Sequence, residues 1–286
     1  MPWNFEYFSF SQVGAGEGDP VPQACYGFWM RILVLGDVVG EPGRRLVEAH
    51  LPALYRELSL DFVIINGENA AHGHGITERI ARQWFEELGV HVITTGNHAF
   101  DVKDIVPYFQ VESRLLRPAN YPPGTPGNGF VKLHTPGGQE VMVINLMGRV
   151  HMPTCDDPFR CVDGILAKER ADIVIVDMHA EATSEAQAMG WYLDGRVAAV
   201  LGTHTHVPTL DAKVLPGGTA YVTDIGMTGP YDGVIGMKKE SSLSRFLKVK
   251  GEKWDVAEGD SQLHGILVVT EGRRAVSIQR ILKTLP

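Results

Sequence analysis

Residues 31–37 read RILVLGD, a run of consecutive apolar residues that ends in a glycine and a carboxylate. Apolar residues on consecutive positions are typical of a strand buried on both faces, as in a sheet that helices cover. Similar short runs, rich in β-branched residues, recur at residues 62–65, 90–93, 141–144, 173–176 and 197–201. These runs predict the strands of an α/β fold.

Helical patterns separate several of these strands. We expect helices at residues 44–58, 76–88 and 184–193. Thr77 is a candidate N-cap of the second helix, and Gly89 is a candidate residue just beyond its C-terminus. Strands that alternate with helices favour layers of sheet and helix packed around a buried core.

The length and composition indicate one ordinary globular domain. The chain has 286 residues, of which 44% are hydrophobic and 21% are charged, and this excludes disordered, collagen-like and coiled-coil classes. A proline- and glycine-rich stretch at residues 118–129 predicts a loop between two halves of a domain that extends over residues 30–286. We find no internal repeat of a solenoid type.

Residues 1–29 differ from the rest of the chain, since they contain no Lys or Arg and hold 8 of its 24 aromatic residues. We expect an N-terminal extension outside the domain, either disordered or non-native, with natural translation starting at Met30. The alternative is an arm that packs its aromatic side chains on a neighbouring subunit. The features of a secretory signal are missing, and no run approaches the roughly 20 apolar residues of a membrane span.

Net charge and cysteine content restrict the partners and the compartment. A net charge of −8 argues against a large nucleic-acid surface, although a local basic pocket remains compatible with it. The three cysteines are few and odd in number, and Cys155 and Cys161 match no zinc-ribbon or redox spacing. We therefore expect reduced thiols in a cytoplasmic protein without a membrane partner. A homo-oligomer remains open.

Five of the predicted strands are followed by a carboxylate, an amide or an imidazole. The segments are GD at 36–37, NGEN at 66–69, TGNH at 95–98, DMH at 177–179 and GTHTH at 202–206. In open α/β sheets, ligands bind outside the carboxyl ends of the strands, where side chains that are distant in sequence can meet. We therefore expect these groups to converge.

Each of these segments also has an ordinary explanation. A glycine and an aspartate after a strand usually form a turn or a helix cap, and a lone histidine such as His179 is more often a structural residue. The pair His204 and His206 is a stronger signal, because imidazoles two residues apart can reach the same space. Five strand ends that all carry metal-ligand types are difficult to explain as turns, and they predict a metal site.

The donor types indicate which metal such a site would hold. Carboxylates, amide oxygens and imidazoles without a thiolate favour Mn, Fe, Zn or Ni over Cu(I). About seven donors exceed the four that one tetrahedral zinc needs. Two metal ions about 3.5–4 Å apart, bridged by a carboxylate and a hydroxide, would use all of them.

The motifs, in this order, resemble those of the calcineurin-like metallophosphoesterases. More narrowly, GENAA at 67–71, GIT at 75–77 and TDIGMTGP at 223–230 resemble the YmdB-like branch, a bacterial group of 2′,3′-cyclic-nucleotide phosphodiesterases. The resemblance covers residues 30 to about 286. It implies a layered αββα sandwich, two divalent or trivalent metal ions, with Fe or Mn favoured over Zn, and a small phosphodiester substrate such as a cyclic nucleotide.

The chain departs from the broad superfamily at two motifs. The usual Asp-x-His is replaced here by Asp37-Val38-Val39, so one metal lacks its usual imidazole, and Asn69 is placed to substitute for it. The usual bridging aspartate is replaced by Glu68. The resemblance implies that the first metal is held by Asp37, Glu68, Asn69 and His206. It implies that the second metal is held by Glu68, Asn97, His179 and His204.

The same resemblance implies that His98 is catalytic, beside the scissile phosphate, where it stabilises the transition state or protonates the leaving oxygen. Asp101 is a candidate for orienting it. His72 and His74 are interpreted as residues at the rim of the site. The other histidines are interpreted as structural or surface residues: His50, His91, His134, His151 and His264.

The resulting hypothesis is a phosphodiesterase in which the bridging hydroxide attacks phosphorus in line. The glycine-rich segment at residues 225–236 would form a loop on the substrate side. A phosphomonoesterase or phosphoprotein phosphatase on the same core is one alternative, for which Arg149 is a candidate clamp. A non-catalytic regulatory scaffold is another, and the presence of His98 argues against it. A hydrolase of non-phosphate esters is a third alternative, and the pair Asn97-His98 argues against it. A Walker-type phosphate loop is lacking, which argues against an ATPase.

Overall fold

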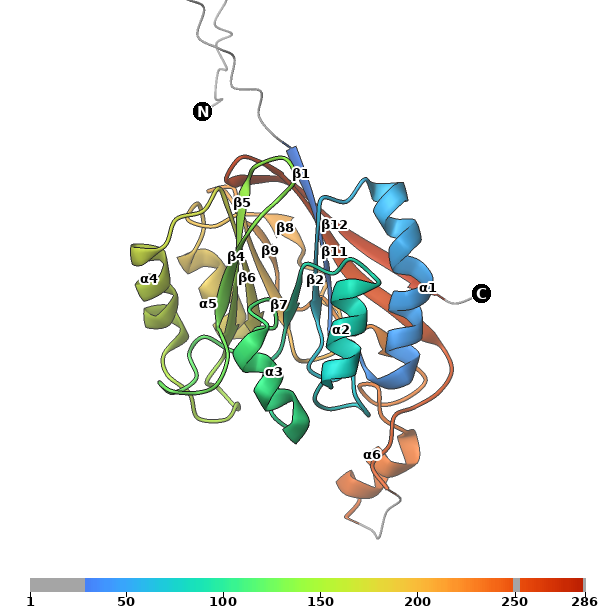
Figure 1. The fold of residues 1–286 in the computed structure, drawn as a ribbon. Coiled ribbons are helices and arrows are strands. Elements are labelled where there is room, and N and C mark those ends of the chain that lie inside the picture. The colour runs from blue at the N-terminus through green and yellow to red at the C-terminus, as the bar shows by residue number, and fades with distance from the viewer. Residues whose placement is uncertain (1–28, 249–252, 285–286) are drawn as a thin grey trace, which may run out of the picture.

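The computed structural model describes residues 29–248 and 253–284, which form two sheets with helices outside them (Figure 1). The interpretation of the N-terminal extension therefore lies outside the described residues, apart from Trp29, with which the first strand begins. The predicted α/β class is confirmed. Among the described residues, none of the helices combines the length and the apolar character that crossing a membrane requires.

The first sheet has six strands in the order β10-β11-β1-β2-β3, with β12 paired to β11. Its strands are β1 (Trp29–Leu35), β2 (Phe62–Asn66), β3 (Val92–Thr94), β10 (Gly229–Pro230), β11 (Ser261–Glu271) and β12 (Arg274–Thr284). Strands β1, β2 and β3 are parallel, whereas β11 runs antiparallel to β1.

The second sheet has six strands in the order β4-β5-β6-β7-β9-β8. They are β4 (Phe130–His134), β5 (Glu140–Met147), β6 (Ile173–His179), β7 (Ala199–Thr203), β8 (Lys213–Val214) and β9 (Ala220–Val222). Strands β5, β6, β7 and β9 are parallel, so their carboxyl ends share one edge.

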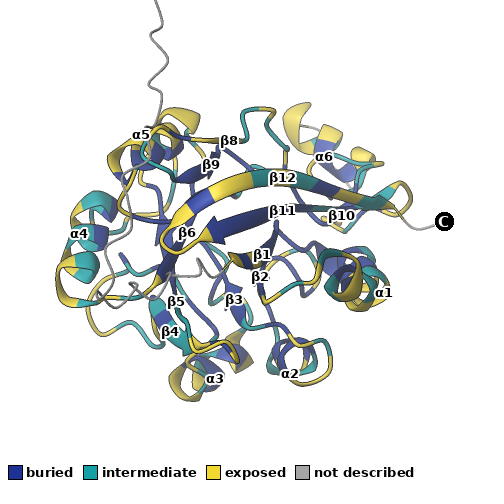
Figure 2. Cartoon of the chain, turned by 90° about the horizontal axis from the view of Figure 1, so that it is seen from above, coloured by how far each residue is buried: buried dark blue, intermediate teal, exposed yellow. Residues whose placement is uncertain are grey.

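Helices α1 and α2 lie outside the first sheet, and α4 and α5 lie outside the second (Figures 1 and 2). The helices are α1 (Gly40–Leu58), α2 (Glu78–Glu86), α3 (Val106–Val111), α4 (Pro158–Lys168), α5 (Thr183–Tyr192) and α6 (Lys239–Phe246), with a 3₁₀ turn, η1 (Lys103–Ile105). Helix α6 projects at the lower end of the molecule in Figure 1.

Alternate residues of each central strand enter different parts of the core, which explains the consecutive apolar positions. In β1, Leu33 packs in a cluster with Trp84 of α2, whereas Ile32 packs in a second cluster with Val143 of the other sheet. In β6, Val176 belongs to a third cluster, on the side of α4 and α5. Burial on both faces follows from this arrangement.

The sequence-based boundaries are close for most central elements and shifted by about two residues for two strands. The run at 197–201 forms a strand over Ala199–Thr203. The run at 90–93 forms a strand only over Val92–Thr94, because the backbone of Val90 bonds to Trp84 at the end of α2. Thr77 caps α2 as expected, accepting a hydrogen bond from the backbone N of Ile80. Gly89 does have a positive φ, but α2 ends earlier, at Glu86, with Glu87 as its C-cap.

Candidate metal centre

The carboxyl ends of strands from both sheets meet at one edge, and the side chains predicted for the site converge there. Asn66, at the end of β2, donates to Asp177 Oδ2 of β6 at 3.3 Å and lies 3.4 Å from Thr203 Oγ1 of β7. The two sheets are therefore joined by hydrogen bonds directly below the segments that carry the donor groups.

The tightest part of the cluster surrounds the Nε2 atom of His179. This atom lies 3.0 Å from Glu68 Oε1, 3.1 Å from Asn97 Oδ1 and 3.1 Å from His204 Nδ1. Donor atoms of Glu68, His179 and His204 all lie within 4.8 Å of one another. These four residues are the set predicted to hold one metal.

The remaining predicted ligands lie beside this group. Asn69 Nδ2 is 3.3 Å from Glu68 Oε1 and 3.1 Å from His206 Nε2, and His206 Nε2 is 3.8 Å from Asp37 Oδ1. Glu68 thus contacts residues of both predicted ligand sets, as a ligand shared by two metals must. Asn69 presents its amide nitrogen here, so a ligand role requires its side chain to turn the oxygen inward.

Hydrogen bonds on the outer nitrogens fix which imidazole nitrogen faces the cluster. His206 Nδ1 lies 2.9 Å from the carbonyl of Ile235, and His204 Nε2 lies 3.2 Å from Glu181 Oε2. These contacts hold a proton on the outer nitrogen, so the inner nitrogen presents its lone pair. Sequence reasoning missed Glu181, which contacts the ring of His204 from outside.

A buried carboxylate below the cluster orients His179, and sequence reasoning gave it no role. His179 Nδ1 lies 2.9 Å from Thr203 Oγ1, which in turn donates to Asp177 Oδ1 at 2.6 Å. Thr94 also donates to Asp177. A sequence signal was present, because Asp177 and His179 are two residues apart on one strand and share a face.

The charges of the cluster perturb its pKa values strongly. Burial raises the pKa of Asp37 to about 7. Burial would also raise that of Glu68, but the neighbouring His179 lowers its pKa to about 2. For His179, burial favours the neutral ring, but the carboxylates of Glu68 and Asp37 raise its pKa to about 9. Buried carboxylates of this kind favour a positive charge beside them.

Three further features fit a metal ion. Asp37 Oδ1 is buried and has no hydrogen-bond partner among the described residues. Gly96 leaves the site open, since a Cβ there would lie 2.1 Å from His179 Cδ2 and 2.5 Å from Glu68 Oε2. His204 and His206 have φ values of 108° and 65°, and such strained backbone persists only where the surrounding structure imposes it, often at functional sites.

His98 lies at the side of the cluster with its ring partly exposed. Its backbone N donates to Glu68 Oε2 at 3.2 Å, and its Nδ1 lies 2.7 Å from Asp101 Oδ2. The contact expected between His98 and Asp101 is therefore present. It leaves Nε2 of His98 available to a bound molecule.

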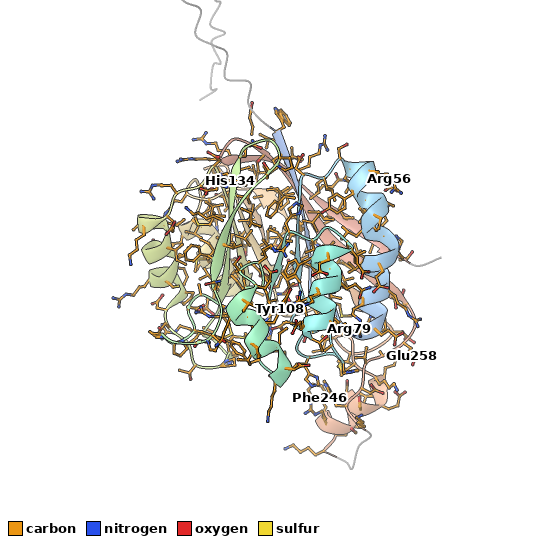
Figure 3. The ribbon with its side chains drawn as sticks, viewed as in Figure 1. Arg56, Arg79, Tyr108, His134, Phe246 and Glu258 are labelled. Atoms are coloured by element: carbon orange, nitrogen blue, oxygen red, sulfur yellow. The ribbon has the colours of Figure 1, made fainter. Side chains whose placement is uncertain are left out.

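The other histidines stay outside the cluster. His72 is exposed and lines a separate cavity of about 450 Å³ with residues 255–259, and the ring of His74 lies 6.3 Å from that of His98. His91 accepts a hydrogen bond from the backbone of Val63 at its Nδ1, a structural role. Figure 3 shows His134 at the upper end of the molecule, far from α6. Cys155 and Cys161 are free thiols.

Replacing Thr203 by Val is expected to weaken Mn²⁺ binding about 10–100-fold, because the bond that orients His179 is lost. The buried Asp177 also loses a donor, so the free energy of unfolding should fall by about 1–3 kcal/mol. Metal titration and urea unfolding measure both effects. The control is Thr95→Val, which also loses a buried hydroxyl bond, to the carbonyl of Leu116 at 2.8 Å. Equal losses of Mn²⁺ affinity in both variants would contradict the role of Thr203.

The comparisons with known proteins show the family of this chain. A family model described as YmdB-like protein matches residues 33–281. A 2′,3′-cyclic-nucleotide 2′-phosphodiesterase of Bacillus subtilis is 48% identical over 257 residues, which cover 88% of this chain and 97% of that protein. The chain therefore belongs to the YmdB-like family.

Two solved structures have the same fold. A hypothetical protein from Thermus thermophilus has a TM-score of 0.85 at 48% identity, over 90% of this chain and 100% of the other. A novel phosphatase of Mycoplasma pneumoniae has a TM-score of 0.85 at 32% identity, over 90% of this chain and 94% of the other. The resemblance to the YmdB-like family found in the motifs is thus confirmed over residues 33–281.

Proposed function

We propose that this chain is a metal-dependent phosphoesterase that hydrolyses small phosphodiesters of the 2′,3′-cyclic nucleotide type. The observation that carries the proposal is the convergence of seven donor side chains, from five strand ends, beside the exposed ring of His98. The activity named for the Bacillus subtilis relative supports this substrate class. The named phosphatase from Mycoplasma pneumoniae supports phosphoester hydrolysis more broadly.

We propose two metal positions that share Glu68. One is formed by Asp37, Glu68, Asn69 and His206, and the other by Glu68, Asn97, His179 and His204. Iron or manganese suits these oxygen and imidazole donors. When bound, such a pair neutralises phosphate oxygens and lowers the pKa of a water so that it becomes a nucleophile. We further propose that the packing of helices and sheets is the αββα sandwich of the calcineurin-like metallophosphoesterases, formed by residues 30–286, with residues 1–29 as an extension whose last residue, Trp29, begins β1.

In this mechanism His98 acts on the leaving oxygen. Its Nδ1 is held by Asp101, which fixes the plane of the ring and leaves Nε2 facing a bound molecule. A proton on Nε2 can then be donated to the nucleoside oxygen as the bond of that oxygen to phosphorus breaks. The backbone bond from His98 to Glu68 fixes the distance between this acid and the cluster.

The experiment is hydrolysis of 2′,3′-cyclic AMP and bis-p-nitrophenyl phosphate by protein loaded with Mn²⁺ or Fe²⁺, compared with protein treated with EDTA. We expect turnover of both substrates only in the loaded protein. Absence of turnover of any phosphodiester by the loaded protein would overturn the proposal.

A phosphomonoesterase on the same core is the second candidate, and the relative named a phosphatase favours it. Its suggested clamp, Arg149, pairs with Asp157 at 3.5 Å, and none of its contacts in the described chain reaches the cluster. p-Nitrophenyl phosphate, tested beside the diesters, separates the two activities, because faster turnover of the monoester would favour this second candidate.

A further inference from the structure

The TDIGMTGP segment at residues 223–230, distinctive in the sequence, has no role in the site as described so far. In the fold it lies against the segment that carries His204 and His206. The backbone N of Ile225 donates to the carbonyl of Gly202 at 2.9 Å, and a Cβ on Gly202 would lie only 1.6 Å from the carbonyl oxygen of Thr223. The two segments are therefore in direct backbone contact.

Within this contact, the carboxylate of Asp224 is completely buried and accepts three hydrogen bonds. Its Oδ2 accepts from both the backbone N and the Oγ1 of Thr205, each at 2.9 Å. Its Oδ1 accepts from the backbone N of Gly226 at 2.7 Å. Asp224 thus joins its own turn to the single residue that separates the two histidines.

That residue, Thr205, lies between two positions with unfavourable backbone conformations. His204 and His206 both have positive φ, although neither is glycine. This conformation directs the imidazoles to different halves of the cluster, with His204 at His179 and His206 at Asn69. A backbone of this kind must be held by its surroundings. The two hydrogen bonds of Thr205 to Asp224, at 2.9 Å each, are shorter than the contacts of its hydroxyl with the backbone of Val207, at 3.3 and 3.4 Å.

We propose that Asp224 is a positioning residue that holds the 204–206 segment so that both imidazoles reach their metals. It touches no donor atom of the cluster and acts through Thr205. The inference rests on the metal centre of the proposed function and adds a residue that the resemblance did not assign to the site.

The test is Asp224→Asn in the full chain. The amide keeps the size of the side chain but has one oxygen, so it cannot accept at both Thr205 and Gly226 and places an N–H against one of these donors. Asp211→Asn is the matched control. Asp211 accepts from Thr209 Oγ1 at 2.6 Å and from the backbone N of Thr223 at 3.2 Å, but it makes no hydrogen bond to residues 203–206.

Mn²⁺ binding to metal-free protein is measured without substrate, and urea unfolding is measured in EDTA. We expect Asp224→Asn to raise the Kd for Mn²⁺ about 10–100-fold, and Asp211→Asn to stay within about threefold of the wild type. If Asp224→Asn does not fold, Thr205→Val replaces it. This variant removes the hydroxyl bond to Asp224 and the longer contacts of the same hydroxyl with the backbone of Val207, and it keeps the backbone bond to Asp224. It should still bind Mn²⁺ more weakly than Asp211→Asn.

Two results would overturn the inference, and they can be told apart. If the wild type binds Mn²⁺ and the variants at Asp224 or Thr205 bind it as Asp211→Asn does, the positioning role is wrong and the metal centre stands. If the wild type binds no metal ion, the metal centre itself is wrong. Equal losses of unfolding free energy in Asp224→Asn and Asp211→Asn, with unequal Mn²⁺ affinity, support positioning over a general structural role.

Discussion

A chain with Glu68→Ala is expected to lose at least about 10³-fold in kcat/KM for 2′,3′-cyclic AMP, or about 4 kcal/mol of transition-state stabilisation. Glu68 is buried between the two halves of the cluster. Its Oε1 lies 3.0 Å from His179 and 3.3 Å from Asn69, and its Oε2 accepts from the backbone of His98. Truncation therefore removes contacts to both proposed metals and to the segment that carries the proposed acid.

The control for this variant is His72→Ala, because His72 is an exposed histidine outside the cluster. We expect His72→Ala to keep activity within about twofold of the wild type, in the range of ordinary surface substitutions. Metal content after reconstitution with Mn²⁺ should fall in Glu68→Ala and remain normal in His72→Ala. Equal losses in the two variants would mean that the proposed ligand set is wrong.

The second large effect is expected for His98→Ala, which should lower kcat by about 10²–10⁴-fold, as removal of a general acid does. Metal content should stay normal, because the side chain contacts Asp101 and none of the donor atoms of the cluster. The bond from its backbone N to Glu68 is also kept in the variant. Loss of activity with retained metal is the result that separates a catalytic role from a ligand role.

His74→Ala is the matched control, since it removes a neighbouring exposed ring 6.3 Å from His98. Its kcat should remain close to that of the wild type. Asp101→Asn should give a loss smaller than that of His98→Ala, because the ring stays but its orientation is less well fixed. An unchanged kcat in His98→Ala would remove this residue from the mechanism, and loss of metal would assign it to the ligands.

The central strands could be predicted from the sequence because both of their faces are buried. Strands β11 and β12 were not predicted. In β12 the exposed and buried positions follow no simple period. The place of β12 is set by its pairing with β11, and β11 in turn pairs with β1, which is more than 200 residues away in the sequence. In β11, by contrast, the buried apolar run at residues 266–269 is of the same kind as the runs that predicted the central strands.

The donor side chains could also be predicted, because their chemical types stand directly after strands. The residues that orient them could not. Asp177 reaches His179 only through Thr203 on the next strand. Glu181, just after β6, contacts the ring of His204, just after β7. These contacts depend on how the parallel strands are aligned. The segment at residues 225–236, which we expect on the substrate side, also holds a ligand candidate in place, because the carbonyl of Ile235 lies 2.9 Å from Nδ1 of His206.

The position of the cluster across two sheets has a consequence for folding. Asp37, Glu68 and Asn97 follow strands of the first sheet, whereas His179 and His204 belong to the ends of strands in the second. Neither half of the molecule can assemble the cluster alone, so partial unfolding that separates the sheets dissolves it. Ligands that bind only the native state add to its stability. Release of metal ions bound at the proposed positions would therefore report the separation of the two sheets.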